Sequence, residues 1–137
     1  MKQSDELIAF TQAFYRAMET ADKSFIRSLF SKEEALVIGT DPQEWIAGFE
    51  KTTKTVEAQA VEMKGISIVD ANPQAFYEGD FGWMADQFKL KFPDNNALPI
   101  RITTVFHKEA EEWRVVQMHW SIGVPNEQLI GYALTIG

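Results

Sequence analysis

Apolar residues recur every three or four positions near the start of the chain, which is the spacing of one face of an amphipathic helix. This stripe consists of Leu7, Phe10, Phe14 and Met18, with Ile8 and Tyr15 on its flank. It predicts a helix over residues 4–20 that Ser4 caps. A second apolar stripe over residues 25–30 follows Asp22 and predicts a shorter helix that begins at this aspartate.

Residues 41–44, Asp-Pro-Gln-Glu, predict the start of a third helix. An aspartate caps free backbone amides, proline suits the first helical position, and a glutamate three residues after the cap closes a capping box. Trp45, Ile46 and Phe49 then form an apolar stripe, which we expect to end in the threonine-rich residues 51–55. Before this helix, the apolar residues 35–39 predict a short buried strand.

The rest of the chain alternates between apolar runs and turn residues, which predicts consecutive strands. The strands are expected over residues 61–70, 75–77, 81–92, 100–107 and 113–121. Helices followed by antiparallel strands are the order of elements in an α+β fold.

The last predicted strand mixes apolar and polar side chains on both of its faces. A period of two places Trp113, Val115, Gln117, His119 and Ser121 on one face, opposite Arg114, Val116, Met118 and Trp120. We therefore expect one face of this strand to wall a pocket and the other to meet a helix or a partner.

Composition narrows the classes of partner. The 137 residues include no cysteine, which excludes disulfides, a thiolate nucleophile and a zinc-thiolate site. The net charge is -7 and the basic residues are scattered, so we expect no binding to nucleic acid or to anionic membranes. Residues 1–7 lack the apolar core of a signal peptide, and no run approaches the roughly 20 apolar residues of a membrane span, so we expect a cytoplasmic protein.

Three stretches of sequence resemble a known superfamily. They are residues 37–45 with Gly48, residues 82–86, and residues 101–107 followed by 113–121. Together with the order of elements, they resemble the NTF2-like superfamily, and most closely its SnoaL-like branch. The last strand pair, with Gly123 and Pro125, is also similar to the association domain of calcium/calmodulin-dependent kinases.

This resemblance implies a single α+β domain over residues 1–137. In it, three N-terminal helices would pack on a strongly curved antiparallel sheet to form a cone. Because this fold hosts isomerases, dehydratases, cyclases, hydrolases and non-enzymatic binders, it does not by itself imply a function.

The function we favour is the binding of a small, largely apolar organic molecule inside the cone. The candidate ligand-binding residues are Phe14, Met18, Trp45, Trp83, Arg101, Thr103 and Ser121. Core packing is an equal explanation for each aromatic residue. Arg101 can distinguish ligand binding from simple packing. A buried guanidinium requires a carboxylate from the protein or from a ligand, whereas a solvent-facing one does not.

The first alternative is an isomerase or lyase that works by acid-base catalysis on a carbonyl-containing molecule, as the resemblance to ketosteroid isomerases implies. Such a reaction needs a carboxylate base and a donor to the developing enolate. The positions where those isomerases carry the two groups fall near Gly39 and Phe14, which lack them. Asp86 and Tyr15 are the candidate substitutes.

His119 is the other candidate catalyst, because histidine titrates near neutrality and Ser121 on the same face would orient it. A hydrogen-bonded structural role is the simpler interpretation of this residue. His107 and His119 are the only histidines, and no carboxylate stands at the spacing of a metal facial triad. We therefore expect no metal and no cofactor.

The second alternative is an assembly or association domain. A sheet with bulky groups on both faces requires a cover on its outer side, which predicts a homodimer through that face. The apolar residues 129–136 alternate like a strand, and they would extend the sheet, cover a partner or dock on their own domain.

Overall fold

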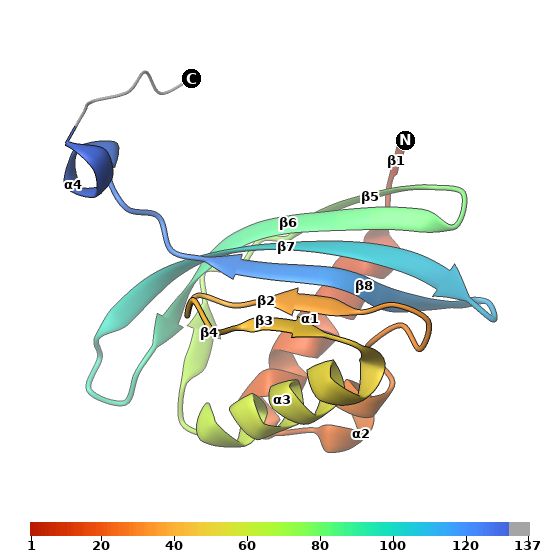
Figure 1. Ribbon diagram of the computed structural model, residues 1–137, viewed down its shortest axis with the longest axis horizontal. Coiled ribbons are helices and arrows are strands. Elements are labelled where there is room, and N and C mark those ends of the chain that lie inside the picture. The colour runs from red at the N-terminus through yellow and green to blue at the C-terminus, as the bar shows by residue number, and fades with distance from the viewer. Residues whose placement is uncertain (132–137) are drawn as a thin grey trace.

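The computed structural model, which describes residues 1–131, consists of a curved sheet with helices on one face (Figure 1). The helices are α1 (Asp5–Thr20), α2 (Lys23–Arg27), α3 (Phe49–Glu62) and α4 (Asn126–Ile130). The strands are β1 (Lys2–Gln3), β2 (Leu36–Ile38), β3 (Trp45–Ala47), β4 (Ser67–Val69), β5 (Gln74–Glu78), β6 (Phe81–Lys91), β7 (Ala97–Glu109) and β8 (Glu112–Ser121).

The strands form one sheet in the order β1-β5-β6-β7-β8-β2-β3, and β4 pairs with β6. Between these strands, all pairings are antiparallel except that of β2 with β8; an isolated parallel bridge also joins Phe30 to Val115 of β8. Helices α1, α2 and α3 lie together against one face, which we call the inner face; the opposite one is the outer face (Figure 1). The predicted α+β class is therefore confirmed.

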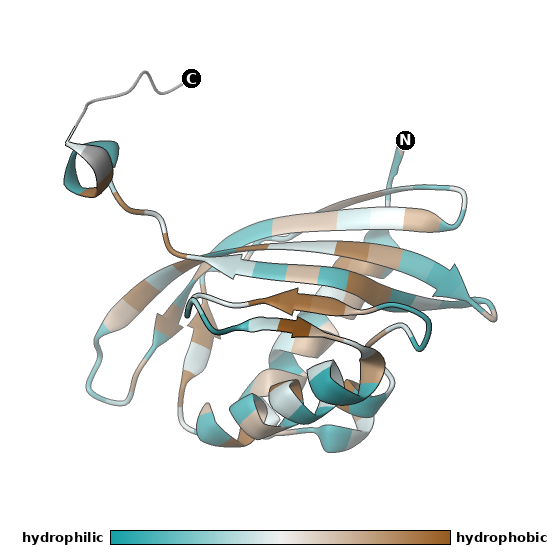
Figure 2. Ribbon diagram, in the orientation of Figure 1, coloured by the Kyte–Doolittle hydropathy of each residue, from teal (hydrophilic) through white to brown (hydrophobic). Residues whose placement is uncertain are grey.

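The apolar stripe of α1 packs on the inner face, as its spacing predicts. Leu7, Phe14 and Met18 are buried against inner-face residues such as Ile102 and Phe106. Ser4 caps the helix, because its hydroxyl accepts a hydrogen bond of 3.0 Å from the backbone amide of Leu7. Hydrophobic and hydrophilic positions alternate along the long strands, which therefore have two different faces (Figure 2).

The prediction that a helix begins at Asp41 is wrong. Residues 41–44 form the turn between β2 and β3, and Trp45–Ala47 pairs with Leu36–Ile38. The local hydrogen bond of a capping box is nevertheless present, because the Glu44 carboxylate accepts from the Asp41 amide at 2.9 Å. Strand pairing with β2 overrides this local signal, and the helix begins only at Phe49.

The threonine-rich segment lies inside α3, contrary to the prediction that the helix ends there. Thr52, Thr53, Val56 and Ala60 are buried at helical spacing, so threonine methyl groups complete the apolar stripe. The Thr52 hydroxyl donates to the carbonyl of Gly48, four residues earlier, at 2.8 Å. The predicted strand over residues 61–70 is correspondingly reduced to Ser67–Val69.

A β-bulge divides β8 and changes which side chains face inward. Val105 is paired with Gln117 but Phe106 with Val115, so Val116 is an extra residue on β8. Trp113 and Val115 are buried before the bulge, whereas Met118 is buried after it. The uninterrupted alternation predicted for this strand is therefore wrong, because one extra residue exchanges the two faces.

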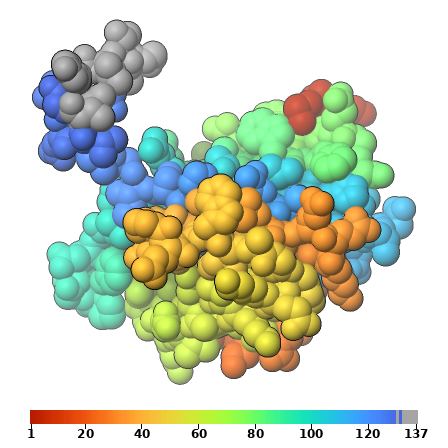
Figure 3. Space-filling view, in the orientation of Figure 1, coloured from red at the N-terminus to blue at the C-terminus, as the bar shows by residue number. Residues whose placement is uncertain are grey.

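Beyond β8, an extended segment leads to α4, which projects from the rest of the molecule (Figure 3). The predicted alternation over residues 129–136 cannot be compared with the structure, because residues 132–137 lie outside the described part. Among the residues described, no helix is both long enough and apolar enough to cross a membrane.

Candidate functional site

A cavity of about 280 Å³ opens between α1, α3 and the inner face of the sheet. Its volume is near the lower limit of typical ligand pockets. The apolar wall is formed by Met18, Val37, Met63, Ile66, Leu90, Leu98, Ile100 and Trp120. The polar end is formed by Gly39, Thr40, Glu44, Gln59 and Glu62.

The bulge in β8 brings Trp120 into this wall. Beyond the bulge, the inner-face positions are Met118 and Trp120, and the indole of Trp120 packs edge-on against two other aromatic rings. Ring centroids lie 6.3 Å away for Phe14 and 5.7 Å away for Phe88. Edge-to-face contacts of this kind are a favoured geometry of aromatic pairs, so they stabilise the position of the indole in the wall.

Glu44 is held in place at the polar end of the cavity. One carboxylate oxygen, Oε2, accepts a hydrogen bond of 2.7 Å from the Gln59 amide, and Oε1 accepts from the Asp41 backbone. Gly39 makes room for this carboxylate, because a Cβ atom at that position would lie 2.6 Å from the Glu44 Cδ atom. Among the described residues that line the cavity, the charged ones, Glu44 and Glu62, are both acidic.

The predicted ligand-binding residues are divided between the two faces of the sheet. Met18 lines the cavity, and Phe14 is buried in the core behind Trp120. The other five, Trp45, Trp83, Arg101, Thr103 and Ser121, lie on the outer face. The prediction that they wall the interior is therefore wrong about their location.

Arg101 is exposed on β7, where its guanidinium lies beside the backbone of Gly123. A solvent-facing guanidinium needs no buried carboxylate partner. The argument from this residue for an anionic ligand group in the cone therefore lapses.

The structure brings two of the three predicted catalytic residues together. The Tyr15 hydroxyl donates a hydrogen bond of 2.7 Å to Oδ2 of Asp86. Burial raises the pKa of Tyr15 well above its ordinary value, and the hydrogen bond to Asp86 and its negative charge raise it further. Oδ1 of Asp86 accepts from the backbone amides of Asn72, at 3.0 Å, and Gln87, at 2.8 Å.

Both oxygens of Asp86 are thus used in hydrogen bonds that connect α1, β6 and the segment before β5. Neither Tyr15 nor Asp86 lines the cavity. His119 is exposed on the outer face, where it pairs across the strands with Thr103 and Ile38. The three residues therefore do not form one catalytic site, and the arrangement of Tyr15 and Asp86 is that of a structural anchor.

Sequence reasoning missed Glu44 and Gln59 as cavity residues. The capping-box pattern identified Glu44 only as the first turn of a helix. Gln59 lies beyond the residue where the third helix was expected to end, although Val56 and Ala60 continue its apolar spacing. Extending the stripe to these residues would have placed Gln59 on a helix that packs against the sheet.

Comparisons with known proteins agree with this fold. Residues 7–125 match the family model of the SnoaL-like domain. No curated protein matches the sequence. A solved NTF2-like protein of unknown function from Pseudomonas putida KT2440 has a TM-score of 0.74 and 16% identity, covering 94% of this chain and 91% of that one.

Two further solved structures share the fold. One, from Streptomyces avermitilis, is a proposed dehydratase of the NTF2-like family, with a TM-score of 0.73 and 15% identity over 88% of this chain and 95% of that one. The other, from Xanthomonas campestris, is a proposed calcium/calmodulin-dependent protein kinase II association domain. Its TM-score is 0.66 and its identity 16%, over 92% of this chain and 96% of that one. From the extent of the family match and the shared architecture, the chain belongs to the SnoaL-like domain family and has the NTF2-like fold.

Proposed function

We propose that this protein binds a small, largely apolar organic molecule in the cavity between α1, α3 and the sheet. The observation that carries the proposal is a cavity of about 280 Å³ whose apolar walls end at an anchored carboxylate, Glu44. Ligand cavities commonly combine such walls with a few fixed polar groups, which orient the ligand.

The polar end favours a ligand that donates hydrogen bonds. Glu44 and Glu62 are acceptors when ionised, and the Gln59 amide nitrogen is already bonded to Glu44. A ligand carboxylate would meet two like charges there, whereas an amine or a hydroxyl would find acceptors. The ligand class that fits best is a hydrophobic amine or alcohol.

A panel of ligand sets tests this proposal; the three members of each set share one hydrophobic skeleton and end in an amine, a hydroxyl or a carboxylate. We expect the amines and alcohols to raise the melting temperature of the protein and the carboxylates to leave it unchanged. Calorimetric titration of the best amine should give an affinity about tenfold weaker for Glu44→Gln, since the amide keeps the shape but removes the charge.

Glu50→Gln is the matched control, because Glu50 is an exposed acidic residue on α3 that does not line the cavity. It should bind the amine like the wild-type protein. If no compound shifts the melting temperature, or if the carboxylates bind best, the proposal is contradicted.

Acid-base catalysis in the same cavity is the second candidate function. The specific observation in its favour is Glu44, a carboxylate fixed at the end of an apolar cavity, where general bases are commonly found. The likeness to a proposed dehydratase also supports it. Turnover on a panel of hydroxy and carbonyl compounds should be abolished in Glu44→Gln and unchanged in His119→Gln; activity that survives the first change excludes Glu44 as the base.

We also propose that the protein is a homodimer through the outer face of the sheet. Large apolar side chains are exposed there, namely Trp45 at 66%, Phe81 at 56% and Trp83 at 37%. Aromatic residues are enriched at protein interfaces, and these three share one face of the sheet. The likeness to a proposed association domain also supports assembly. Sedimentation of the protein as a monomer at micromolar concentration would refute the proposed homodimer.

A further inference from the structure

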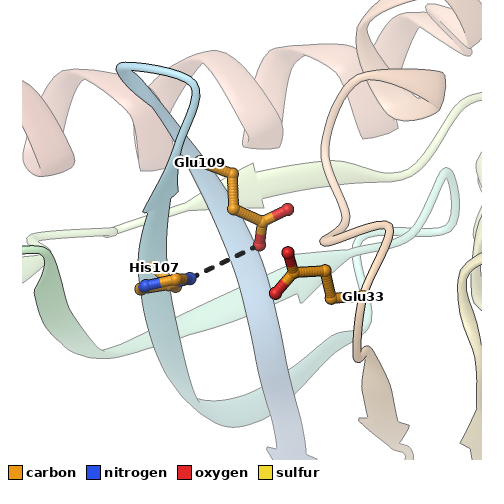
Figure 4. Close-up of side chains that lie close together, drawn as sticks. All are labelled: Glu33, His107 and Glu109. Carbon is orange, nitrogen blue, oxygen red and sulfur yellow. Dashed lines mark ion pairs between the residues drawn. The ribbon is translucent and has the colours of Figure 1, made fainter.

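Two acidic side chains and a histidine meet on the outer face, away from the cavity. His107 and Glu109 are two residues apart on β7 and therefore project to the same side. Glu33 belongs to the segment between α2 and β2, which runs beside β8, since the Ser31 amide donates to the Val115 carbonyl at 2.8 Å. The three side chains point toward one another (Figure 4).

The atoms that could coordinate an ion are close together. One ligand atom from each of Glu33, His107 and Glu109 lies within 4.8 Å of the other two. Within the group, Nδ1 of His107 is 3.6 Å from Oε2 of Glu109. The imidazole also stacks on Phe81, with ring centroids 4.5 Å apart, and this contact holds the plane of the ring.

One oxygen of Glu109 accepts no hydrogen bond within residues 1–131, the part of the chain that the structure describes. Its side chain is 17% exposed, but Oε2 is buried and accepts no hydrogen bond from any described residue. Burying a carboxylate oxygen without a donor is costly, and most such atoms in folded proteins are satisfied. This oxygen faces the Glu33 carboxylate and the ring nitrogen of His107. A cation bound between these groups would therefore be stabilised by the two carboxylates.

The neighbouring cationic side chains, Arg114 and Lys108, do not neutralise these carboxylates. Arg114 is the cross-strand neighbour of His107, but its guanidinium bonds the Glu112 carboxylate at 2.8 Å and the Ser28 carbonyl. Lys108 projects to the opposite side of β7, where its ammonium lies 4.9 Å from the centre of the Trp113 ring. Neither is bonded to Glu109.

We propose that Glu33, His107 and Glu109 bind a divalent transition-metal cation, with Zn²⁺ as the best fit. Imidazole suits zinc and other first-row metals, whereas Mg²⁺ and Ca²⁺ prefer sites made only of oxygen ligands. Metal bonds of about 2.0–2.2 Å require the ligand atoms to approach one another more closely than 4.8 Å. Rotation of the exposed Glu33 side chain would bring its carboxylate close enough to the other two ligands. Water molecules would complete the coordination.

The sequence alone predicts no metal site, because His107 and Glu109 offer only two ligands and the third is distant along the chain. Pairing of residues 29–31 with β8 brings Glu33 to the other two. The site is separate from the interior cavity, so its existence does not depend on the proposed ligand.

Titration of ZnCl₂ into protein that has been treated with EDTA and exchanged into metal-free buffer tests the proposal. We expect one zinc ion per chain by calorimetry and a melting temperature that rises with zinc and falls again when EDTA is added. MgCl₂ should give neither signal. Removing a residue that only hydrogen-bonds to a metal ligand weakens metal binding by about 10–100-fold. Replacing a ligand itself, as in His107→Gln or Glu109→Gln, should therefore weaken zinc binding by at least as much.

The chain offers matched controls for two of the ligands. His119→Gln changes the second histidine of the outer face, and Glu34→Gln changes the neighbour of Glu33; both should bind zinc like the wild-type protein. Circular dichroism of each variant without metal checks that it is folded. The proposal is overturned if wild-type protein gives no heat and no thermal shift with zinc, or if folded His107→Gln binds with unchanged affinity.

Discussion

Tyr15 and Asp86 connect the first helix to the sheet through a single hydrogen bond of 2.7 Å. Because burial and the neighbouring carboxylate raise the pKa of Tyr15, the folded protein keeps this phenol protonated under conditions in which an unfolded chain releases the proton. A residue considered for catalysis thus contributes to stability, and its effect has a defined pH dependence.

Tyr15→Phe should lower the free energy of unfolding at neutral pH by about 1–2 kcal/mol, because Oδ2 of Asp86 loses its donor. The contribution of the phenol is fully present below about pH 10 and declines above it, where only the unfolded state loses the proton. The variant should therefore show a shallower alkaline loss of stability than the wild-type protein in urea unfolding measured from neutral to strongly alkaline pH. Equal alkaline slopes would contradict this role.

Gly39 controls the cavity by leaving space for Glu44. In Gly39→Ala the new methyl group would meet the Cβ and Cδ atoms of Glu44 at 2.7 and 2.6 Å, so the glutamate must move. We expect the variant to fold but to bind the amine ligands about as weakly as Glu44→Gln, as measured by calorimetric titration. Unchanged affinity would show that the position of Glu44 does not matter to the ligand.

At the scale of elements, close contact between α1 and β6 determines how the helix sits on the sheet. Gly82 faces Leu7, and a Cβ atom at this position would lie 2.5 Å from the Cδ1 atom of Leu7 and 3.1 Å from the carbonyl oxygen of Phe76. Leu7 is fully buried, so it has little room to withdraw. The glycine allows the helix to approach the strand.

Gly82→Ala should destabilise the protein by about 1–3 kcal/mol, the usual cost of overpacking a core. Gly123→Ala is the control, because its Cβ would make only ordinary contacts, 3.6 Å or longer, with Arg101. Its effect should remain within about 0.5 kcal/mol. Denaturant unfolding compares the two; equal stabilities would contradict the close-contact argument.

Elements with a strong local pattern are predictable from the sequence, as α1 with its Ser4 cap and the strands β6 to β8 show. Predictions failed where a distant segment decided the outcome. The turn at Asp41 has the hydrogen bond of a capping box, yet Trp45 enters a strand because β2 is available to pair with it. The bulge at Val116 depends on the register between β7 and β8. The alternation of apolar and polar residues within β8 carries no information about this register.

At the scale of the whole molecule, the curved sheet separates two surfaces. The cavity lies on its inner face with the helices, and the exposed tryptophans lie on its outer face. The proposed ligand site and the proposed dimer interface are therefore independent of each other.

Replacing both Trp45 and Trp83 with lysine should convert the proposed dimer to a monomer in sedimentation velocity, because like charges would then meet across the two-fold contact. The same variant should keep the thermal shift produced by amine ligands, since neither residue lines the cavity. A variant that remains dimeric would place the interface elsewhere.

The sequence by itself determined the helical stripe of α1, the long strands, the α+β class and the family resemblance, because these depend on spacings within a few residues. Only the tertiary structure decided that Trp120 and Glu44 line the cavity while His119 and Arg101 face outward. It also brought Glu33 to His107 and Glu109. The physical reason is that strand register, a bulge and the pairing of remote segments set these positions, and each arises from contacts between parts of the chain that are distant in sequence.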